Sequence, residues 1–108
     1  MNFGNGLNGK RRPILITYVD SNVVHFLSIT SQYEKKSDEI KKQYYPIREW
    51  REIGLPKESW IDIGSIREMN LGDLSLDYIG TLTTIDVAGL AEFIENFNKD
   101  TEIGRAHV

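Results

Sequence analysis

Two apolar stretches near the start of the chain predict a β-hairpin. Residues 14–19 and 23–29 are rich in β-branched and aromatic side chains, which favour strands. The polar triplet Asp20-Ser21-Asn22 between them is typical of a turn that joins antiparallel strands. The rest of the chain therefore has a well-defined hairpin to pack against.

The register of this hairpin follows from the length of its turn. With a three-residue turn centred on Ser21, Val19 pairs with Val23, and Arg12 faces Thr30 at the open end. Directly opposed residues point to the same side of a sheet, with Cβ atoms roughly 5 Å apart. A guanidinium and a hydroxyl would then converge at the open end of the hairpin, and such a pair can bind a phosphate.

This prediction depends on the turn. A two-residue turn or a β-bulge would bring Arg11 or Ser31 into one of the two positions instead.

The remaining pattern predicts short elements. Residues 1–9 are rich in glycine and asparagine and predict a mobile loop, because the backbone entropy of such a segment opposes regular structure. After the hairpin we expect, in chain order, a charged surface loop over 31–43, an extended segment over 44–47 and a short helix over 49–53 that ends at Gly54. Strands are expected over 59–63, 66–69 and 76–82, and Gly80 should bend the last of them.

The last element has a clear helical pattern. Thr83 can cap a helix, and Asp86 follows three residues later. We expect this helix to end near Asn98. Its apolar stripe has the spacing of one helix face and consists of Val87, Leu90, Ala91, Ile94 and Phe97. Several short strands and one amphipathic helix predict a mainly β (α+β) fold, a small barrel or strongly bent sheet with the helix packed on it.

Composition limits the choices further. The 108 residues suffice for one core, and the absence of cysteine excludes disulfides and thiolate metal sites. No apolar run is long enough to span a bilayer, so we expect a cytoplasmic protein with no membrane partner. The net charge of −3 is divided unevenly: residues 1–57 carry +4 and residues 58–108 carry −7. One basic and one acidic face are therefore expected.

Several short segments together resemble the toxins of the MazF/PemK type, which are endoribonucleases of bacterial toxin-antitoxin pairs. The resemblance depends on the order and spacing of the segments, which are residues 9–16, 27–31, 59–62, 65–67 and 79–82. It covers roughly residues 9 to 97. It implies an SH3-like β-barrel with a C-terminal helix, a homodimer, and a cognate antitoxin as protein partner.

The resemblance also implies an activity. Proteins of this type cleave single-stranded RNA at specific sequences without a metal or cofactor, through attack of the ribose 2′-hydroxyl on the adjacent phosphate. The catalytic pair of the family corresponds to Arg12 and Thr30, the two residues that the predicted hairpin brings together. A fixed guanidinium beside a hydroxyl can hold the charge that develops on the phosphoryl oxygens.

Other side chains are candidates for contact with the RNA. Lys10 and Arg11 could bind the RNA backbone or could be solvated surface charges, and Ser31 and Gln32 could contact RNA or begin a loop. Arg67 could support the site or be an exposed strand arginine.

Two groups of residues are assigned structural roles. Alternation puts His25 on the face opposite Thr30, which favours a buried structural histidine. Trp50 and Trp60 are expected in the core or at a dimer contact rather than as platforms for bases. No His, Asp and Glu residues have the spacing of metal ligands, so no metal site is predicted.

Both ends of the chain depart from the family pattern. The family begins with a strand before the glycine-rich loop, and this chain starts within that loop, so we expect the first barrel strand to be missing. Residues 103–108 resemble a translated sequencing adapter, which predicts one domain over 1–102 and a non-native tail.

The sequence thus predicts a toxin-type endoribonuclease. The alternative is an SH3-like barrel module or truncated toxin relic that binds a protein partner and does not cut RNA.

Overall fold

The protein is a small, mainly β molecule with one long C-terminal helix, as expected from the sequence. The computed structural model describes the backbone of residues 2–6, 12–64, 66–73 and 76–106, and the side chains of 13–64, 66–73 and 81–99. In chain order its elements are β1 (Asn2–Gly6), β2 (Arg12–Asp20), β3 (Val23–Thr30), the 3₁₀ turn η1 (Tyr33–Lys35), α1 (Asp38–Lys41), β4 (Tyr44–Pro46), β5 (Trp60–Asp62), β6 (Arg67–Asn70), the 3₁₀ turn η2 (Leu71–Asp73), β7 (Leu76–Thr81) and α2 (Thr84–Ala106).

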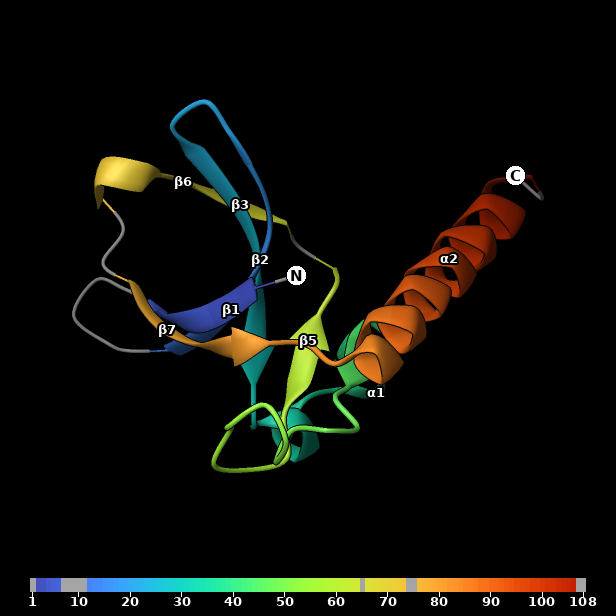
Figure 1. Ribbon diagram of the computed structural model, residues 1–108. Coiled ribbons are helices and arrows are strands. Elements are labelled where there is room, and N and C mark those ends of the chain that lie inside the picture. The colour runs from blue at the N-terminus through green and yellow to red at the C-terminus, as the bar shows by residue number, and fades with distance from the viewer. Residues whose placement is uncertain (1, 7–11, 65, 74–75, 107–108) are drawn as a thin grey trace.

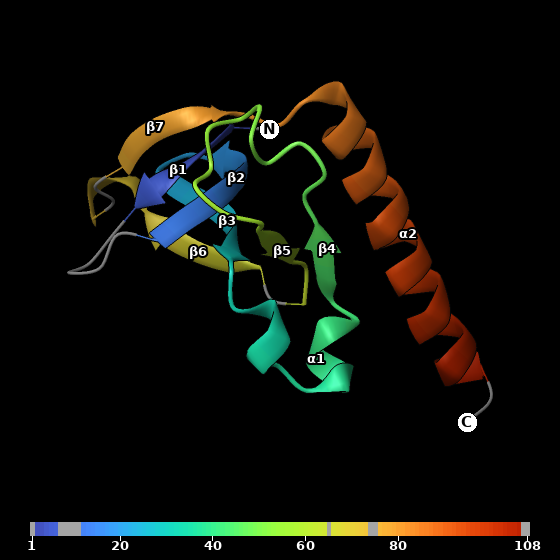
Figure 2. The same cartoon turned by 90° about the horizontal axis from the view of Figure 1, so that it is seen from below.

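The described strands form one strongly curved antiparallel sheet. Its order is β4-β5-β3-β2-β1-β7, and β6 also pairs with β3. β3 is central, because it pairs with β2, β5 and β6 along different parts of its length. Figure 1 shows the sheet curling into a barrel-like shape, and Figure 2 shows α2 running beside β4 and projecting beyond the sheet.

The first strand is present, contrary to expectation. Residues 2–6 form β1, which pairs with β2 on one side and β7 on the other. A segment rich in glycine and asparagine has little strand propensity, so the two neighbouring strands supply the backbone hydrogen bonds that fix it. The prediction of a mobile loop is therefore wrong for residues 2–6, whereas residues 7–9 lie outside the described residues. The prediction of a missing first strand is wrong as well.

The β2–β3 hairpin has a shorter turn than expected. Asp20 pairs with Val23, so only Ser21 and Asn22 form the turn, and Ser21 adopts a positive φ of 55°. A bulge at Thr17 then inserts one extra residue into β2, since the pairing shifts between the residues on either side of it. The bulge restores the predicted register in the open half of the hairpin.

The core lies on both faces of β3. The larger cluster fills the side covered by α2, and the smaller one lies between β2, β3 and β6. Buried residues of the larger cluster are Leu15, Leu27, Ile29, Tyr45, Ile47, Ile53, Leu55, Ile61, Leu82 and Leu90, and those of the smaller are Ile14, Val24 and Phe26. Because apolar side chains cover both faces, β3 is held rigidly and can position the residues at its end.

Helix α2 begins where the sequence predicts but ends later. The hydroxyl of Thr83 accepts a hydrogen bond from the backbone N–H of Asp86 at 3.4 Å, as expected of a cap. The helix continues to Ala106 rather than ending near Asn98, and it includes residues 103–106 of the proposed tail. Within its apolar stripe Ala91 is exposed, and Phe93 packs against the core instead.

A tight run of turns replaces the short helix expected at 49–53. The N–H of Leu55 bonds to the carbonyl of Trp50, and the N–H of Gly54 bonds to that of Arg51. This is the pattern that ends many helices, with Gly54 in the left-handed region at φ 91°. The prediction that a glycine ends this segment is therefore correct, although the turns before Gly54 do not form a regular helix.

No described helix is both long enough and apolar enough to cross a membrane.

Candidate functional site

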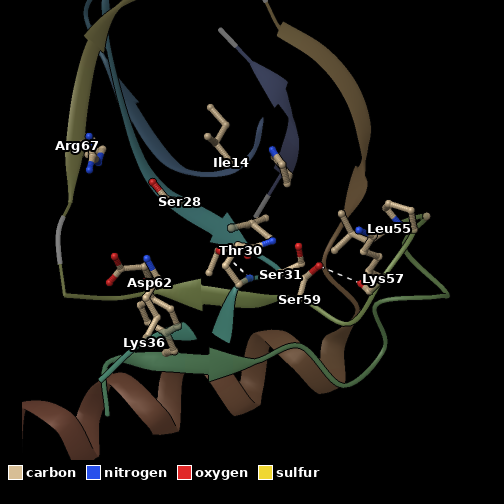
Figure 3. A pocket seen from close by; sticks show the side chains of 16 residues that line it. Ile14, Ser28, Thr30, Ser31, Lys36, Leu55, Lys57, Ser59, Asp62 and Arg67 are labelled. Atoms are coloured by element: carbon tan, nitrogen blue, oxygen red, sulfur yellow. Dashed lines mark hydrogen bonds between the residues drawn. The ribbon is translucent and has the colours of Figure 1, made fainter. Parts of the chain in front are cut away.

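An open groove lies at the end of β3 where the hairpin strands separate. Its volume is about 980 Å³. Figure 3 shows Ser28 and Thr30 on β3 along its floor, with Arg67 and Asp62 toward one end and Lys57 toward the other. The described lining residues are Pro13, Ile14, Ser28, Ile29, Thr30, Ser31, Gln32, Lys36, Tyr44, Gly54, Leu55, Pro56, Lys57, Ser59, Asp62 and Arg67.

Thr30 occupies the floor of this groove. It is half-buried, and its backbone pairs with Trp60 of β5. Its Oγ1 accepts a hydrogen bond of 3.0 Å from the backbone N–H of Gln32, which fixes the side chain at the strand end. This bond uses a lone pair of the oxygen, so the hydroxyl hydrogen can be donated to a ligand.

The observed register bears directly on Arg12. Ile14 pairs with Ser28, and the same register continued by two residues along each strand leads to Arg12 and Thr30. Arg12 is the first residue of β2, and its backbone is described, but its side chain is not. Lys10 and Arg11 lie outside the described residues entirely.

Three of the other predicted residues line the groove. Ser31 and Gln32 follow β3 directly and are exposed, and Arg67 is exposed at the start of β6. The structure thus brings Arg67 to the same cavity as Thr30, although 37 positions separate them in the chain.

Two lysines of the groove were not singled out from the sequence. Lys36 approaches from the segment after η1, and Lys57 from the loop before β5. Both belong to ordinary charged surface stretches, and nothing in their local pattern indicates which lysine turns toward a cavity. With Arg67 they give the described lining a positive charge that suits an anion.

Asp62 is the carboxylate of the described lining. Its Oδ1 accepts hydrogen bonds from Gln43 Nε2 at 3.0 Å and from the backbone N–H of Gly64 at 2.9 Å. Tyr44 pairs with Asp62 across the β4–β5 ladder. Burial, and in addition the charge of Asp62, raise the pKa of Tyr44. The sequence predicted a strand over 59–63, and Asp62 is the last residue of β5, but the sequence did not predict a position inside the groove.

His25 has the structural role expected from strand alternation. It is buried, its ring stacks on Tyr18 with centroids 4.0 Å apart, and its Nδ1 lies 3.3 Å from Oε1 of Glu68. His25 is not among the described residues that line the groove.

The two tryptophans contact other side chains of the same chain. Trp60 stacks on Tyr33 with centroids 4.6 Å apart, and Trp50 packs against the larger core. Leu55 is only 5% exposed. These contacts within one chain fit the structural role expected of Trp50 and Trp60.

No three His, Cys, Asp or Glu residues in the described parts of the chain cluster closely enough to hold a metal ion. The side-chain groups of the described lining that could bind a ligand are hydroxyls, an amide, ammonium groups, a guanidinium and one carboxylate.

The fold has close counterparts among solved structures. The toxin MazF-mt6 of Mycobacterium tuberculosis superimposes with a TM-score of 0.68, at 22% sequence identity, over 89% of this chain and 94% of that one. A crystal structure of an Mtb toxin gives a TM-score of 0.63 at 21% identity, over 89% and 98% of the two chains. No protein-family model matches the sequence, and no curated protein does. The fold is that of these toxins, as the sequence resemblance predicted.

Proposed function

We propose that this protein is the toxin of a toxin-antitoxin pair and a metal-independent, sequence-specific endoribonuclease that cleaves single-stranded RNA. The observation that carries the proposal is the groove at the end of β3. It combines a fixed threonine hydroxyl with three cationic side chains, and it occurs in a chain that shares its fold with two toxins.

The dimensions and charge of the groove suit a polyanion. It is partly open to solvent, and Lys36, Lys57 and Arg67 line it from three separate segments of the chain. Cations spread along a groove can follow a phosphodiester backbone, whereas a site for one small anion concentrates them at a point.

The proposed reaction is a transesterification. The ribose 2′-oxygen forms a bond to the adjacent phosphorus and loses its proton, while the bond from phosphorus to the 5′-oxygen breaks and the leaving oxygen gains a proton. The products are a 2′,3′-cyclic phosphate and a 5′-hydroxyl.

Arg12 and Thr30 are the proposed catalytic pair. The guanidinium would neutralise the charge that builds on the phosphoryl oxygens, and the Thr30 hydroxyl would donate to one of them. Arginine stays protonated at neutral pH, so we assign Arg12 an electrostatic role rather than that of a general base. The rigidity of β3 supports this assignment, because a preorganised donor needs no reorganisation during the reaction.

The remaining candidate contacts follow the RNA away from the scissile phosphate. Ser31 and Gln32 continue directly from Thr30, and Arg67 lies on a neighbouring strand of the same groove. Lys10 and Arg11 precede β2, and we propose that they bind the RNA backbone near Arg12.

The test is cleavage of a long single-stranded RNA by the purified protein, with and without a chelator. We expect the same fragments in both, ending in a 2′,3′-cyclic phosphate and a 5′-hydroxyl. Activity that disappears with chelator and returns with a divalent ion would contradict the metal-independent mechanism.

We further propose that the protein acts in the cytoplasm as a homodimer that a cognate antitoxin inhibits. Light scattering at tens of micromolar should show a dimer, since an interface of standard size persists at that concentration. Only monomer in that range would contradict the assembly without affecting the cleavage proposal.

The rival function, a partner-binding module without activity, was supported by the missing first strand and by the overall acidity of the chain. The pairing of β1 with two neighbours removes the first of these supports. The RNA cleavage assay also discriminates between the two functions, because a binding module would leave the RNA intact.

A further inference from the structure

Asp62 is unusual among the groove residues because its charge opposes RNA. The described lining contains three cationic side chains and one carboxylate. A carboxylate that met the RNA backbone would repel it, so its presence in a phosphate-binding groove indicates a different contact. The neutral hydrogen-bond donors of a ribonucleotide are its 2′-hydroxyl, which attacks the phosphate in the proposed reaction, and the edge of its base, which is left to meet Asp62.

The Asp62 carboxylate is held in one orientation. Its Oδ1 accepts from Gln43 Nε2 and from the N–H of Gly64, and the carbonyl of Gln43 in turn accepts from the N–H of Ile63. A Cβ at Gly64 would collide with the amide of Gln43, so this arrangement requires glycine there. A side chain fixed in this way can discriminate between ligands, because it cannot rotate to suit each one.

Both hydrogen bonds that Asp62 accepts from described residues end on its Oδ1. Asp62 is half-buried and lines the groove, so among the described residues Oδ2 is left as an acceptor that a ligand can reach. In Figure 3 the carboxylate lies on the same side of β5 as Thr30, at the Arg67 end of the groove.

Asp62 also lies close to the proposed scissile phosphate. Thr30 pairs with Trp60, and Asp62 is two residues further along the same strand. Such diagonal neighbours in a sheet are roughly 7–8 Å apart. This spacing allows one nucleotide to contact Thr30 through its phosphate and Asp62 through its base.

We propose that Asp62 reads a base next to the cleavage site, accepting a hydrogen bond at Oδ2 from the exocyclic amino group of adenine, cytosine or guanine. Uracil lacks such a group, and its one base donor, the ring N3–H, lies between two carbonyl oxygens that a carboxylate repels, so uracil is selected against at this position. The inference rests on the proposed RNA-binding function, and it adds a specificity-determining residue to that function.

Asp62→Asn gives a sharp test, because the hydrogen bonds dictate how the new amide is oriented. The two donors on Oδ1 require the amide oxygen at that position, so the NH₂ group replaces Oδ2. The groove then presents a donor where it had an acceptor. We expect the variant to keep its fold and to change its base preference from amino-bearing bases toward uracil.

The first measurement is binding of short 2′-O-methyl RNAs, which lack the attacking hydroxyl, by fluorescence anisotropy. Each RNA pool fixes one base at one position. For the unaltered protein we expect uracil at one position to weaken binding about tenfold or more. Asp62→Asn should abolish or reverse that difference. Asp20→Asn, the same change at an exposed strand end outside the groove lining, should leave it unchanged.

A second measurement needs no variant. Replacing guanosine by inosine, or adenosine by purine riboside, removes only the exocyclic amino group. Where the preferred base at the selected position is guanine or adenine, the corresponding replacement should weaken binding by the unaltered protein as much as uracil does.

The outcomes separate the two proposals. Base discrimination that Asp62→Asn abolishes, without any RNA cleavage, would support base reading by Asp62 and contradict the endoribonuclease. Cleavage with the same sequence preference in the unaltered protein and in Asp62→Asn would support the endoribonuclease and overturn the role of Asp62. Absence of binding to any RNA would overturn both.

Discussion

Two carboxylates of this protein illustrate the difference between its groove and the side covered by α2. Asp86 is fully buried, and its two oxygens accept from Tyr45 Oη at 2.7 Å, from Arg48 N at 2.8 Å and from Glu49 N at 2.9 Å. Asp62 lies half-buried in the groove and uses one oxygen for two bonds. Asp86 therefore stabilises the fold, whereas Asp62, as far as its contacts with described residues go, retains an acceptor for a ligand.

The same contrast extends to the neighbours of each carboxylate. Around Asp86, helix α2, β4 and the turns at 48–54 are joined by one hydrogen-bond network next to the larger core. Around Asp62, the groove lining is polar, charged and open to water. Buried polar groups that lose a partner are costly, so changes near Asp86 should lower stability, and changes in the groove should lower function.

The largest effect is expected at Arg12. Arg12→Ala should lower RNA cleavage by a factor on the order of 10² or more, since it removes the proposed donor to the transition state. Thr30→Val should cost less, because it removes one hydroxyl and keeps the β-branched shape. Single-turnover cleavage rates measure both, and thermal unfolding should show an intact fold. Arg48→Ala, at an exposed arginine outside the groove lining, is the matched control.

His25 separates the two regions in the same assay. His25→Gln should change stability more than the cleavage rate, because the ring is buried against Tyr18 and Glu68. A large loss of rate at His25 with little loss at Arg12 would overturn the proposed catalytic pair.

Asp86→Ala tests the side covered by α2. The change leaves three hydrogen-bond donors without their acceptor, so the free energy of unfolding should fall by roughly 2–4 kcal/mol. Urea denaturation measures the loss. Asp62→Ala, the matched change in the groove, should lower the free energy of unfolding by about 1 kcal/mol at most. Equal losses at the two positions would contradict the contrast between them.

The hydroxyl of Tyr45 links stability to pH. Burial, followed by the hydrogen bond to Asp86, raises the pKa of Tyr45 above its ordinary value. The folded protein keeps this proton at pH values where the unfolded chain loses it. The stabilisation is therefore complete below the ordinary pKa of about 10 and decreases as pH rises above it.

Tyr45→Phe should reduce this alkaline decrease and leave the part that comes from the raised pKa of Tyr44. It should also lower the free energy of unfolding at neutral pH by about 1 kcal/mol, because one buried hydrogen bond is lost. Denaturation curves between pH 7 and pH 11 measure both effects. An identical alkaline decrease in the variant would show that another group causes it.

The smallest effect is expected at a helical glycine. Alanine favours a helix over glycine by about 1 kcal/mol, but a Cβ at Gly89 would collide with the hydroxyl of Tyr45, which Asp86 holds in place. Gly89→Ala should therefore destabilise the protein slightly. Gly72→Ala, where a Cβ would meet nothing within 4 Å, should not. Stabilisation by Gly89→Ala would show that Tyr45 can move aside.

The register of the open half of the hairpin, where Ile14 pairs with Ser28 as predicted, shows how a local pattern can give a correct result by an inaccurate route. The turn is one residue shorter than predicted, and the bulge at Thr17 compensates for that difference. The Thr17 hydroxyl bonds to the carbonyl of His25 at 3.0 Å, which ties the bulged backbone to β3. No feature of the sequence around Thr17 identifies a bulge, because its cause is the curvature of the whole sheet.

Much of the groove could not be predicted in this way. Thr30, Ser31 and Gln32 are adjacent in the chain, so one local pattern finds all three. Lys36, Lys57 and Asp62 come from different elements, and only the pairing of β5 with β3 and β4 brings these elements together. Their residue types are common on any protein surface, so the sequence alone does not distinguish them.

By itself the sequence determined the hairpin, the start of α2 at Thr83 and the glycine stop at Gly54, because each depends on contacts between residues close in the chain. Only the tertiary structure decided that residues 2–6 form a strand, since their hydrogen bonds come from β2 and β7. It likewise decided the different surroundings of two aspartates that look alike in sequence: burial leaves Asp86 no oxygen for a ligand, whereas the open groove leaves Asp62 one.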